Sequence, residues 1–146
     1  MKFRLLLLFI GIVHCSFAQS VEGRWKTFDI FDPTVPESVV EIKIVEEELL
    51  ITIVEIIPEE HRNDVCRSCP GKLKDQPILG MTILQGARNQ KGVWKGARIL
   101  NAKNGRYYGC HISVENPDLL KVRGFVGYPV FGKNLYWTRV KDPVYR

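Results

Sequence analysis

The pair Cys66 and Cys69, in a Cys-x-x-Cys spacing, is the part of this chain best suited to covalent chemistry. In an oxidising compartment the pair can close a short disulfide, whereas in a thiol oxidoreductase the first cysteine serves as a low-pKa thiolate. Pro70 follows directly, where the helix of a redox motif would have to continue. The sequence therefore favours a structural disulfide that holds the Pro58–Pro77 loop, with a redox pair and a metal site as the alternatives.

A metal site would need further ligands, and the candidates are His61, Asp64, Cys110 and His111. Cys110 and His111 are adjacent in a predicted strand, so they point to opposite faces and cannot bind one ion together. We therefore expect no metal and no other cofactor. Cys110 is expected to be a small buried hydrophobic residue.

Motifs for catalysis are missing from the chain. It contains no Gly-x-Ser-x-Gly elbow, no glycine-rich phosphate loop and no His-Glu-x-x-His helix. The carboxylates Glu59 and Glu60 lie in a predicted loop, where nothing would desolvate them. The sequence predicts no catalytic residue, and we expect a protein that is not an enzyme.

The amino-terminal segment has the three parts of a secretory signal peptide. Lys2 and Arg4 precede an apolar run, Leu5–Val13, and small residues lead to Ala18. We expect cleavage after residue 18, a single domain over residues 19–146, and export to the periplasm or the cell exterior. No other segment is long and uncharged enough to predict a transmembrane helix. The 146 residues carry a formal charge of +5 without a basic stripe, so nucleic acid is not an expected partner.

Alternating apolar and polar residues predict strands along most of the chain. Between two of these runs, Asn104-Gly105 is typical of a tight hairpin turn. No window shows a convincing helical period, so the fold class is all-β with antiparallel neighbours. The eight predicted strands lie at Gly23–Phe31, Ser38–Val45, Leu49–Ile57, Leu79–Gly86, Val93–Leu100, Arg106–Glu115, Leu119–Arg123 and Asn134–Lys141.

The segment Leu49–Ile57 departs from this pattern because it is apolar on both faces. An antiparallel strand with one wet face should alternate instead. Two explanations remain open at this point. Either the Pro58–Pro77 linker folds back over the outer face of the strand, or a second copy of the chain packs there and forms a homodimer.

Several blocks of the chain together resemble the bacterial family known as domain of unknown function 2147. They are Gly23-Arg24-Trp25, the Cys66-x-x-Cys69 loop with Pro77-Ile78-Leu79-Gly80, Trp94-x-Gly96-x-x-Ile99-Leu100 with Asn104-Gly105-x-x-Tyr108, Leu120-x-Val122-Arg123-Gly124-Phe125-x-Gly127, and Trp137-Thr138-Arg139. The resemblance implies a small exported protein with an antiparallel, lipocalin-like β-barrel of about eight strands. It also implies that Trp25 on the first strand packs under Arg139 on the last and closes one barrel mouth. It implies no reaction.

A barrel of this size can hold one small molecule or be filled by its own side chains. Our first hypothesis is that it binds a small apolar or amphipathic ligand, with inward-facing candidates on several strands and Arg123 near a mouth as an anchor. The candidates are Ile42, Ile44, Tyr108, Ile112, Leu120, Val122 and Arg123. A filled barrel that serves as a protein-interaction or envelope-maintenance module is the second hypothesis. The third is a thiol-redox protein acting through Cys66 and Cys69.

Overall fold

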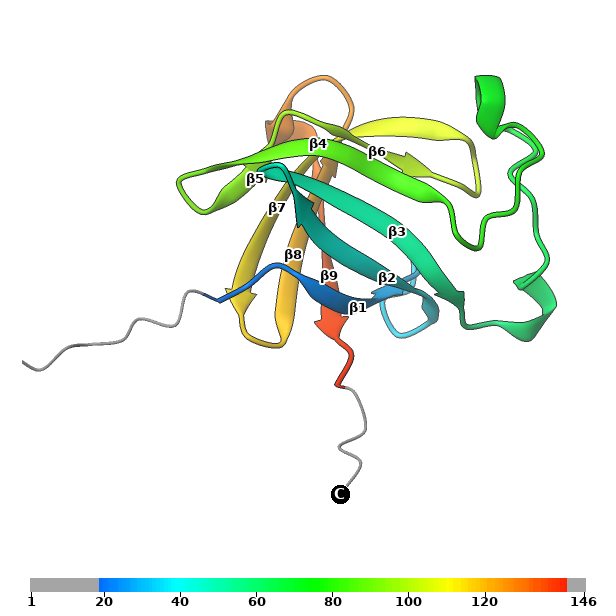
Figure 1. Ribbon diagram of the computed structural model, residues 1–146, viewed down its shortest axis with the longest axis horizontal. Helices are drawn as coiled ribbons and strands as arrows, with labels where there is room; N and C mark the ends of the chain where they lie inside the picture. Colours follow the sequence, from blue (N-terminus) through cyan, green and yellow to red (C-terminus); the bar gives the residue numbers. More distant parts are fainter. Residues whose placement is uncertain (1–18, 142–146) are drawn as a thin grey trace, which may run out of the picture.

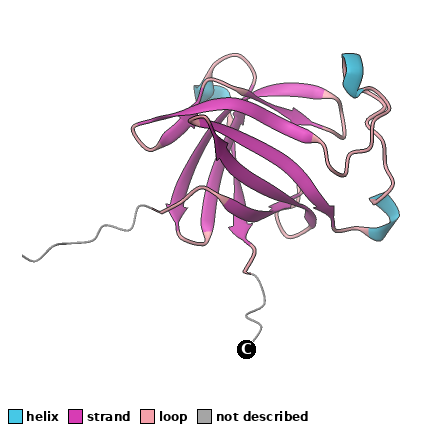
Figure 2. Cartoon of the chain, in the orientation of Figure 1, coloured by secondary structure: helices cyan, strands magenta, loops and turns pink. Residues whose placement is uncertain are grey.

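A computed structural model describes residues 19–141 of the chain; the predicted signal peptide and residues 142–146 lie outside the described part. Three short 3-10 turns, at Glu59–His61, Gly71–Leu73 and Pro129–Phe131, lie in the connections between strands (Figure 2). The strands are β1 Gly23–Phe28, β2 Pro36–Val45, β3 Glu48–Ile56, β4 Thr82–Gln90, β5 Val93–Lys95, β6 Arg98–Asn101, β7 Arg106–Asn116, β8 Leu119–Phe125 and β9 Lys133–Arg139.

The strands form one antiparallel sheet that closes on itself (Figure 1). Its order is β5-β4-β3-β2-β1-β9-β8-β7-β6, and β5 also pairs with β7, which completes the ring. Strands β5 and β6 both pair with β7 and are separated only by Gly96 and Ala97, so they act as one interrupted strand. The prediction of an all-β, antiparallel barrel of about eight strands is confirmed.

Two predicted strand boundaries shift for local reasons. The strand expected at Leu79–Gly86 begins only at Thr82 and runs on to Gln90. Just before β4, the Gly80 amide donates to the Ile53 carbonyl and the Ile53 amide donates to the Met81 carbonyl, so these residues bond to β3 outside the regular ladder. Ile78, one residue earlier than the predicted strand, donates to the Asp64 carbonyl of the linker. The strand expected at Val93–Leu100 is interrupted because Gly96 takes a φ of +89°, which a strand residue with a side chain rarely adopts.

One end of the barrel is closed by the first and last strands. Trp25 of β1 pairs in register with Arg139 of β9, and the guanidinium carbon lies 4.1 Å from the indole centroid. The Trp25 indole is fully buried and donates to the Val21 carbonyl at 2.9 Å. Arg139 donates in addition to three carbonyls of the surrounding segments: Pro117 at 2.5 Å, Glu22 at 2.8 Å and Ser20 at 2.7 Å. These contacts join four segments of the chain at what we call the closed end.

The doubly apolar segment is strand β3, and its two faces differ in burial. Leu49, Ile51 and Ile53 point into the barrel and are buried, while Leu50 is half-buried and Val54 is exposed. The linker between β3 and β4 lies beyond the end of β3 and does not cover its outer face (Figure 1). It is at the open end of the barrel, opposite the closed end, where Val65 and its neighbours line a cavity. The predicted homodimer through Leu49–Ile57 stays a prediction, and its test must change the outward-facing Leu50 or Val54.

Candidate functional site

The open end of the barrel contains a cavity of about 930 Å³ that is partly exposed to solvent. Its inner wall is apolar and is built from side chains of six strands. They are Val40 of β2, Ile53 of β3, Ile83 of β4, Leu100 of β6, Val122 of β8, and Leu135 and Trp137 of β9. Because alternate residues of a strand face the same side, each strand contributes to this wall without a special motif.

The half of the barrel near the closed end is filled by side chains. The six largest fully buried side chains of the described residues fill the interior of the barrel outside the cavity: Trp25, Ile42, Leu49, Ile51, Ile112 and Leu120. None of these six lines the cavity. The barrel interior is therefore packed with side chains near the closed end and contains the cavity at the open end.

The predicted ligand-binding residues divide along this boundary. Tyr108 and Val122 line the cavity. Ile42, Ile112 and Leu120 do face inward, but they belong to the packed half, so assigning them to the cavity wall was wrong. The alternation of side chains along a strand shows which face of the sheet a residue lies on, but it does not show the position of the residue along the barrel axis.

Two further predicted ligand residues lie elsewhere. Ile44 is 39% exposed because β2 extends past the start of β1, whose first residue, Gly23, pairs with Ile42. Arg123 does not line the cavity, and its guanidinium supports the β8–β9 loop instead. It donates to the carbonyls of Pro129 and Val130 and to the Asn134 side chain.

Several residues of the cavity wall were not singled out from the sequence. Ile53, Ile83, Leu100, Leu135 and Trp137 all lie in predicted strands. Alternation indicates an inward direction for Leu135 and Trp137, whereas the segment around Ile53 is apolar on both faces and gives no direction. The missing information was which end of the barrel stays open. That depends on which loops and strand ends pack into the interior.

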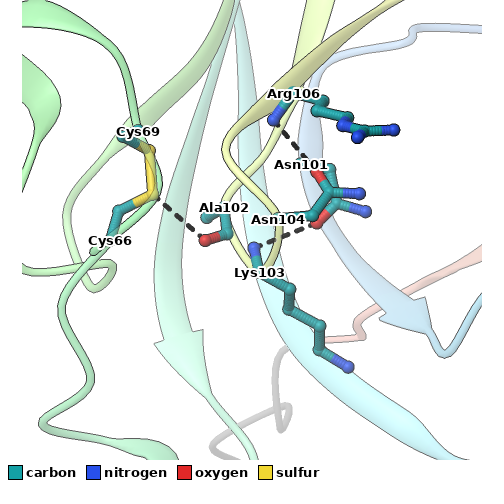
Figure 3. The surroundings of a disulfide bond; sticks show 7 residues. All are labelled: Cys66, Cys69, Asn101, Ala102, Lys103, Asn104 and Arg106. Atoms are coloured by element: carbon teal, nitrogen blue, oxygen red, sulfur yellow. Dashed lines mark hydrogen bonds between the residues drawn. A yellow bond between two sulfur atoms is a disulfide. The ribbon is translucent and has the colours of Figure 1, made fainter.

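The linker between β3 and β4 forms one side of the cavity mouth, and the Cys66–Cys69 disulfide holds it (Figure 3). The S–S bond joins two cysteines that are almost completely buried. Cys66 Sγ lies 3.1 Å from the Ala102 carbonyl oxygen; a disulfide sulfur carries no hydrogen, so this is a sulfur–oxygen contact. The linker thus packs directly on the turn between β6 and β7.

The glycine of that turn permits the close approach. Gly105 has a φ of +68°, and a Cβ placed there would lie 1.9 Å from the Ser68 carbonyl oxygen. The Asn104-Gly105 turn therefore has two roles, because it connects two strands and also seats the linker. Its neighbour Asn104 donates to the Tyr108 hydroxyl at 2.9 Å, which places a polar group at the cavity mouth.

A charged cluster lies on the other side of the mouth. The Lys103 ammonium pairs with Glu37 and lies 3.4 Å from Asp29, and both Lys103 and Glu37 line the cavity. Burial raises the pKa of Glu37 despite this ion pair. The backbone amides of Phe31 and Asp32 donate to Asp29 and lower its pKa to about 2. The cluster connects the β1–β2 loop to the β6–β7 turn across the mouth.

These opposite shifts predict opposite pH effects on stability. The pKa of Asp29 is lower in the folded chain than its ordinary value of 3.8. Its stabilising contribution should therefore be complete above that value and disappear as the pH falls through about 2. Urea denaturation should show that Asp29→Asn destabilises the protein at pH 7 and that the difference from wild type narrows in strong acid.

Glu37→Gln is the matched comparison, and its pH dependence should have the other sign. A carboxyl with a raised folded pKa contributes stability at low pH that is lost as the pH rises through that pKa. Wild type should therefore lose stability relative to Glu37→Gln on going from acid to neutral pH. Parallel pH profiles for the two variants would contradict the assignment of these shifts.

Of the remaining chemical candidates, His61 and Asp64 lie together, with 2.9 Å between His61 Nδ1 and an Asp64 carboxylate oxygen, and both line the cavity. Cys110 and His111 do not line it. Burial raises the pKa of the Cys110 thiol to about 12, so this free cysteine is protonated and unreactive at neutral pH. His111 packs edge-on against Phe125, and burial, with Lys95 and Arg123 nearby, lowers its pKa. Within residues 19–141, no three His, Cys, Asp or Glu side chains lie close enough to hold a metal ion. In the same range, no helix has the length and apolar character needed to span a membrane.

Comparison with known proteins agrees with this architecture. A bacterial family described as uncharacterised conserved proteins (DUF2147) matches residues 23–139. No curated protein sequence matches the chain. A solved structure of the Helicobacter pylori protein HP1028, described as belonging to the lipocalin family, superimposes with a TM-score of 0.72 at 17% sequence identity, covering 84% of each chain. At this identity the similarity establishes the lipocalin-like fold alone.

Proposed function

The chain belongs to the DUF2147 family of uncharacterised bacterial proteins, and because the family carries no assigned activity, we propose a function from the cavity. The protein binds one small apolar or amphipathic molecule in the open half of its barrel. One observation carries the proposal: a cavity of about 930 Å³ remains at one end of a barrel whose other end is packed and closed. A barrel that is hollow at one end supports ligand binding over an interaction module with a filled interior.

The size and lining of the cavity suit such a ligand. Pockets for small molecules typically measure about 300–1,000 Å³ and have mostly apolar walls with a few polar groups. Here the apolar wall lies inside the barrel, while Glu37, Lys103 and the Tyr108 hydroxyl lie at the mouth. An amphipathic molecule would place its apolar part against residues such as Leu100 and its polar end among these groups.

The proposal includes a non-enzymatic role in an exported protein. The disulfide between Cys66 and Cys69 supports export, because such bonds persist mainly in oxidising compartments. Cys66 and Cys69 are both buried, which favours a structural role for their disulfide over a redox role. Lipocalin-like folds are typically not enzymes, and the isolated Cys110 and His111 provide no nucleophile paired with a base.

Binding of the fluorescent probe N-phenyl-1-naphthylamine tests the proposal. The mature wild-type protein should bind the probe with one saturable site. Leu135 lines the cavity, and replacing it by tryptophan places a larger ring in the same space. Leu135→Trp should therefore raise the Kd at least about tenfold, equivalent to about 1.4 kcal/mol.

The neighbouring residue on β9 provides the control. Tyr136 is 47% exposed on the outer face of the barrel, so Tyr136→Trp should leave the Kd unchanged. Circular dichroism and urea midpoints would show that both variants fold. If Leu135→Trp is too unstable to measure, Ile99→Phe makes the same test from β6. Saturable binding that neither cavity variant weakens, or no binding by wild type, would refute the cavity as the site.

A further inference from the structure

A loop at the open end presents four large apolar side chains to solvent. Val126, Tyr128, Val130 and Phe131, between β8 and β9, are 73–80% exposed. Single exposed apolar residues are common, but a contiguous group of this size on a water-soluble surface usually marks an interaction site. Together with Phe31, which is 90% exposed on the β1–β2 loop, we call these residues the apolar rim.

The loop is held in a defined shape. The Arg123 guanidinium donates to the Pro129 carbonyl at 2.7 Å, to the Val130 carbonyl at 3.2 Å and to the Asn134 side chain at 2.8 Å. Gly132 lets the end of the loop pass close to the end of β8, because a Cβ at this position would lie 2.8 Å from the Gly124 carbonyl oxygen. Two further backbone hydrogen bonds, from Phe131 to Tyr128 and from Gly132 to Pro129, close the turn, and the four apolar side chains of the loop are exposed.

Lys133 connects the two parts of the rim and places them at the cavity mouth. Its ammonium donates to the Ile30 carbonyl and lies 5.5 Å from the centre of the Phe31 ring. Ile30, Phe31 and Lys133 all line the cavity. One member of the rim, Phe31, therefore lies at the opening of the cavity, and Lys133, at the end of the β8–β9 loop, lies beside it.

We propose that the apolar rim docks the protein on the surface of a lipid bilayer, with the cavity mouth facing the lipid. Phenylalanine and tyrosine side chains insert readily at the boundary between head groups and acyl chains, and a lysine beside them can extend to the phosphates. Lys133 lies beside Phe31, and its ammonium would exchange the Ile30 carbonyl for a lipid phosphate on docking. The chain's formal charge of +5, or +3 once Lys2 and Arg4 are lost with the predicted leader, is opposite in sign to anionic lipids.

The size of the rim favours a bilayer over a second copy of the chain. A stable protein interface buries about 20–30 residues on each side, or about 800 Å² per partner. The rim offers five large side chains, which is well short of that number. Shallow insertion into a bilayer needs only a few such groups. The proposal goes beyond ligand binding, because the rim can dock whether or not the cavity is occupied.

Vesicle co-sedimentation tests this proposal. The mature protein should bind vesicles of equal parts phosphatidylcholine and phosphatidylglycerol more strongly than vesicles of phosphatidylcholine alone. The double variant Phe31→Ser/Phe131→Ser removes two highly exposed rings, so it should fold normally and reduce partitioning at least about tenfold. Tyr136→Ser removes an exposed aromatic ring from the barrel wall and should have no effect.

The outcomes separate docking from ligand binding. Leu135→Trp should lose probe binding yet keep vesicle binding, since it changes the cavity and not the rim. A wild-type protein that binds the probe but not vesicles would overturn docking and leave the cavity function standing. Equal vesicle binding by wild type and the double variant would also overturn it. So would a dimer in sedimentation that the double variant disperses, because the rim would then bind a second copy.

Discussion

Trp25→Ala is expected to lower the free energy of unfolding by about 3–5 kcal/mol. The indole is fully buried, so its removal leaves a large void in the packed half of the barrel. Val21 also loses the donor to its carbonyl, and the Arg139 guanidinium loses the ring on which it lies at 4.1 Å. Urea denaturation followed by far-ultraviolet circular dichroism measures the change.

Tyr136→Ala is the control for this variant. It removes an aromatic side chain that is 47% exposed on β9, the strand that pairs with β1, and should change stability by less than about 1 kcal/mol.

A double-mutant cycle of Trp25→Ala with Arg139→Ala should give a coupling energy of about 0.5–2 kcal/mol for the stacked pair. A Trp25→Ala protein as stable as Tyr136→Ala would show that the closed end does not depend on the indole.

Gly105→Ala is the second large perturbation, with an expected loss of about 2–4 kcal/mol. The residue has a φ of +68°, which strains any side chain, and its Cβ would lie 1.9 Å from the Ser68 carbonyl oxygen. That oxygen belongs to the backbone of the disulfide-held linker and cannot rotate away. The linker must therefore move off the turn, and hydrogen exchange should show faster exchange of amides such as Cys66 and Ile78.

Gly92→Ala separates the two causes of this effect. Gly92 has a comparable φ of +86° in the turn between β4 and β5, but nothing lies within 4 Å of an added Cβ. It should therefore show the conformational strain alone, about 1 kcal/mol. Equal losses for the two variants would mean that the contact between the turn and the linker adds no stability.

These two contacts lie at opposite ends of the barrel and support different parts of the proposed function. The Trp25–Arg139 contact keeps the closed end sealed, so a ligand has one route of entry. The Gly105 contact holds the linker beside that route, where Val65 and Ser68 line the cavity. Loss of the first should lower the stability of the whole barrel, whereas loss of the second should also change access to the cavity.

The sequence alone determined the fold class and the strand order along the chain. Alternating residues such as Val40, Glu41 and Ile42 report which face of a sheet each side chain occupies, and that is a local property of the backbone. The Asn104-Gly105 turn is similarly local. The resemblance to a known family added the barrel and its family assignment, both of which are confirmed. The boundaries that moved include the start of β4, which lies at Thr82, and the break at Gly96, where a positive φ interrupts the strand predicted at Val93–Leu100.

Only the tertiary structure decided where the cavity lies. Val40 and Ile42 are two residues apart on the same inward face, yet Val40 lines the hollow and Ile42 lies in the packed half. Ile44, two residues further, is exposed because the neighbouring strand has not yet begun. Depth along a barrel depends on the stagger of neighbouring strands and on which loops fill each end. These contacts join residues far apart in sequence, and no pattern within a single strand records them.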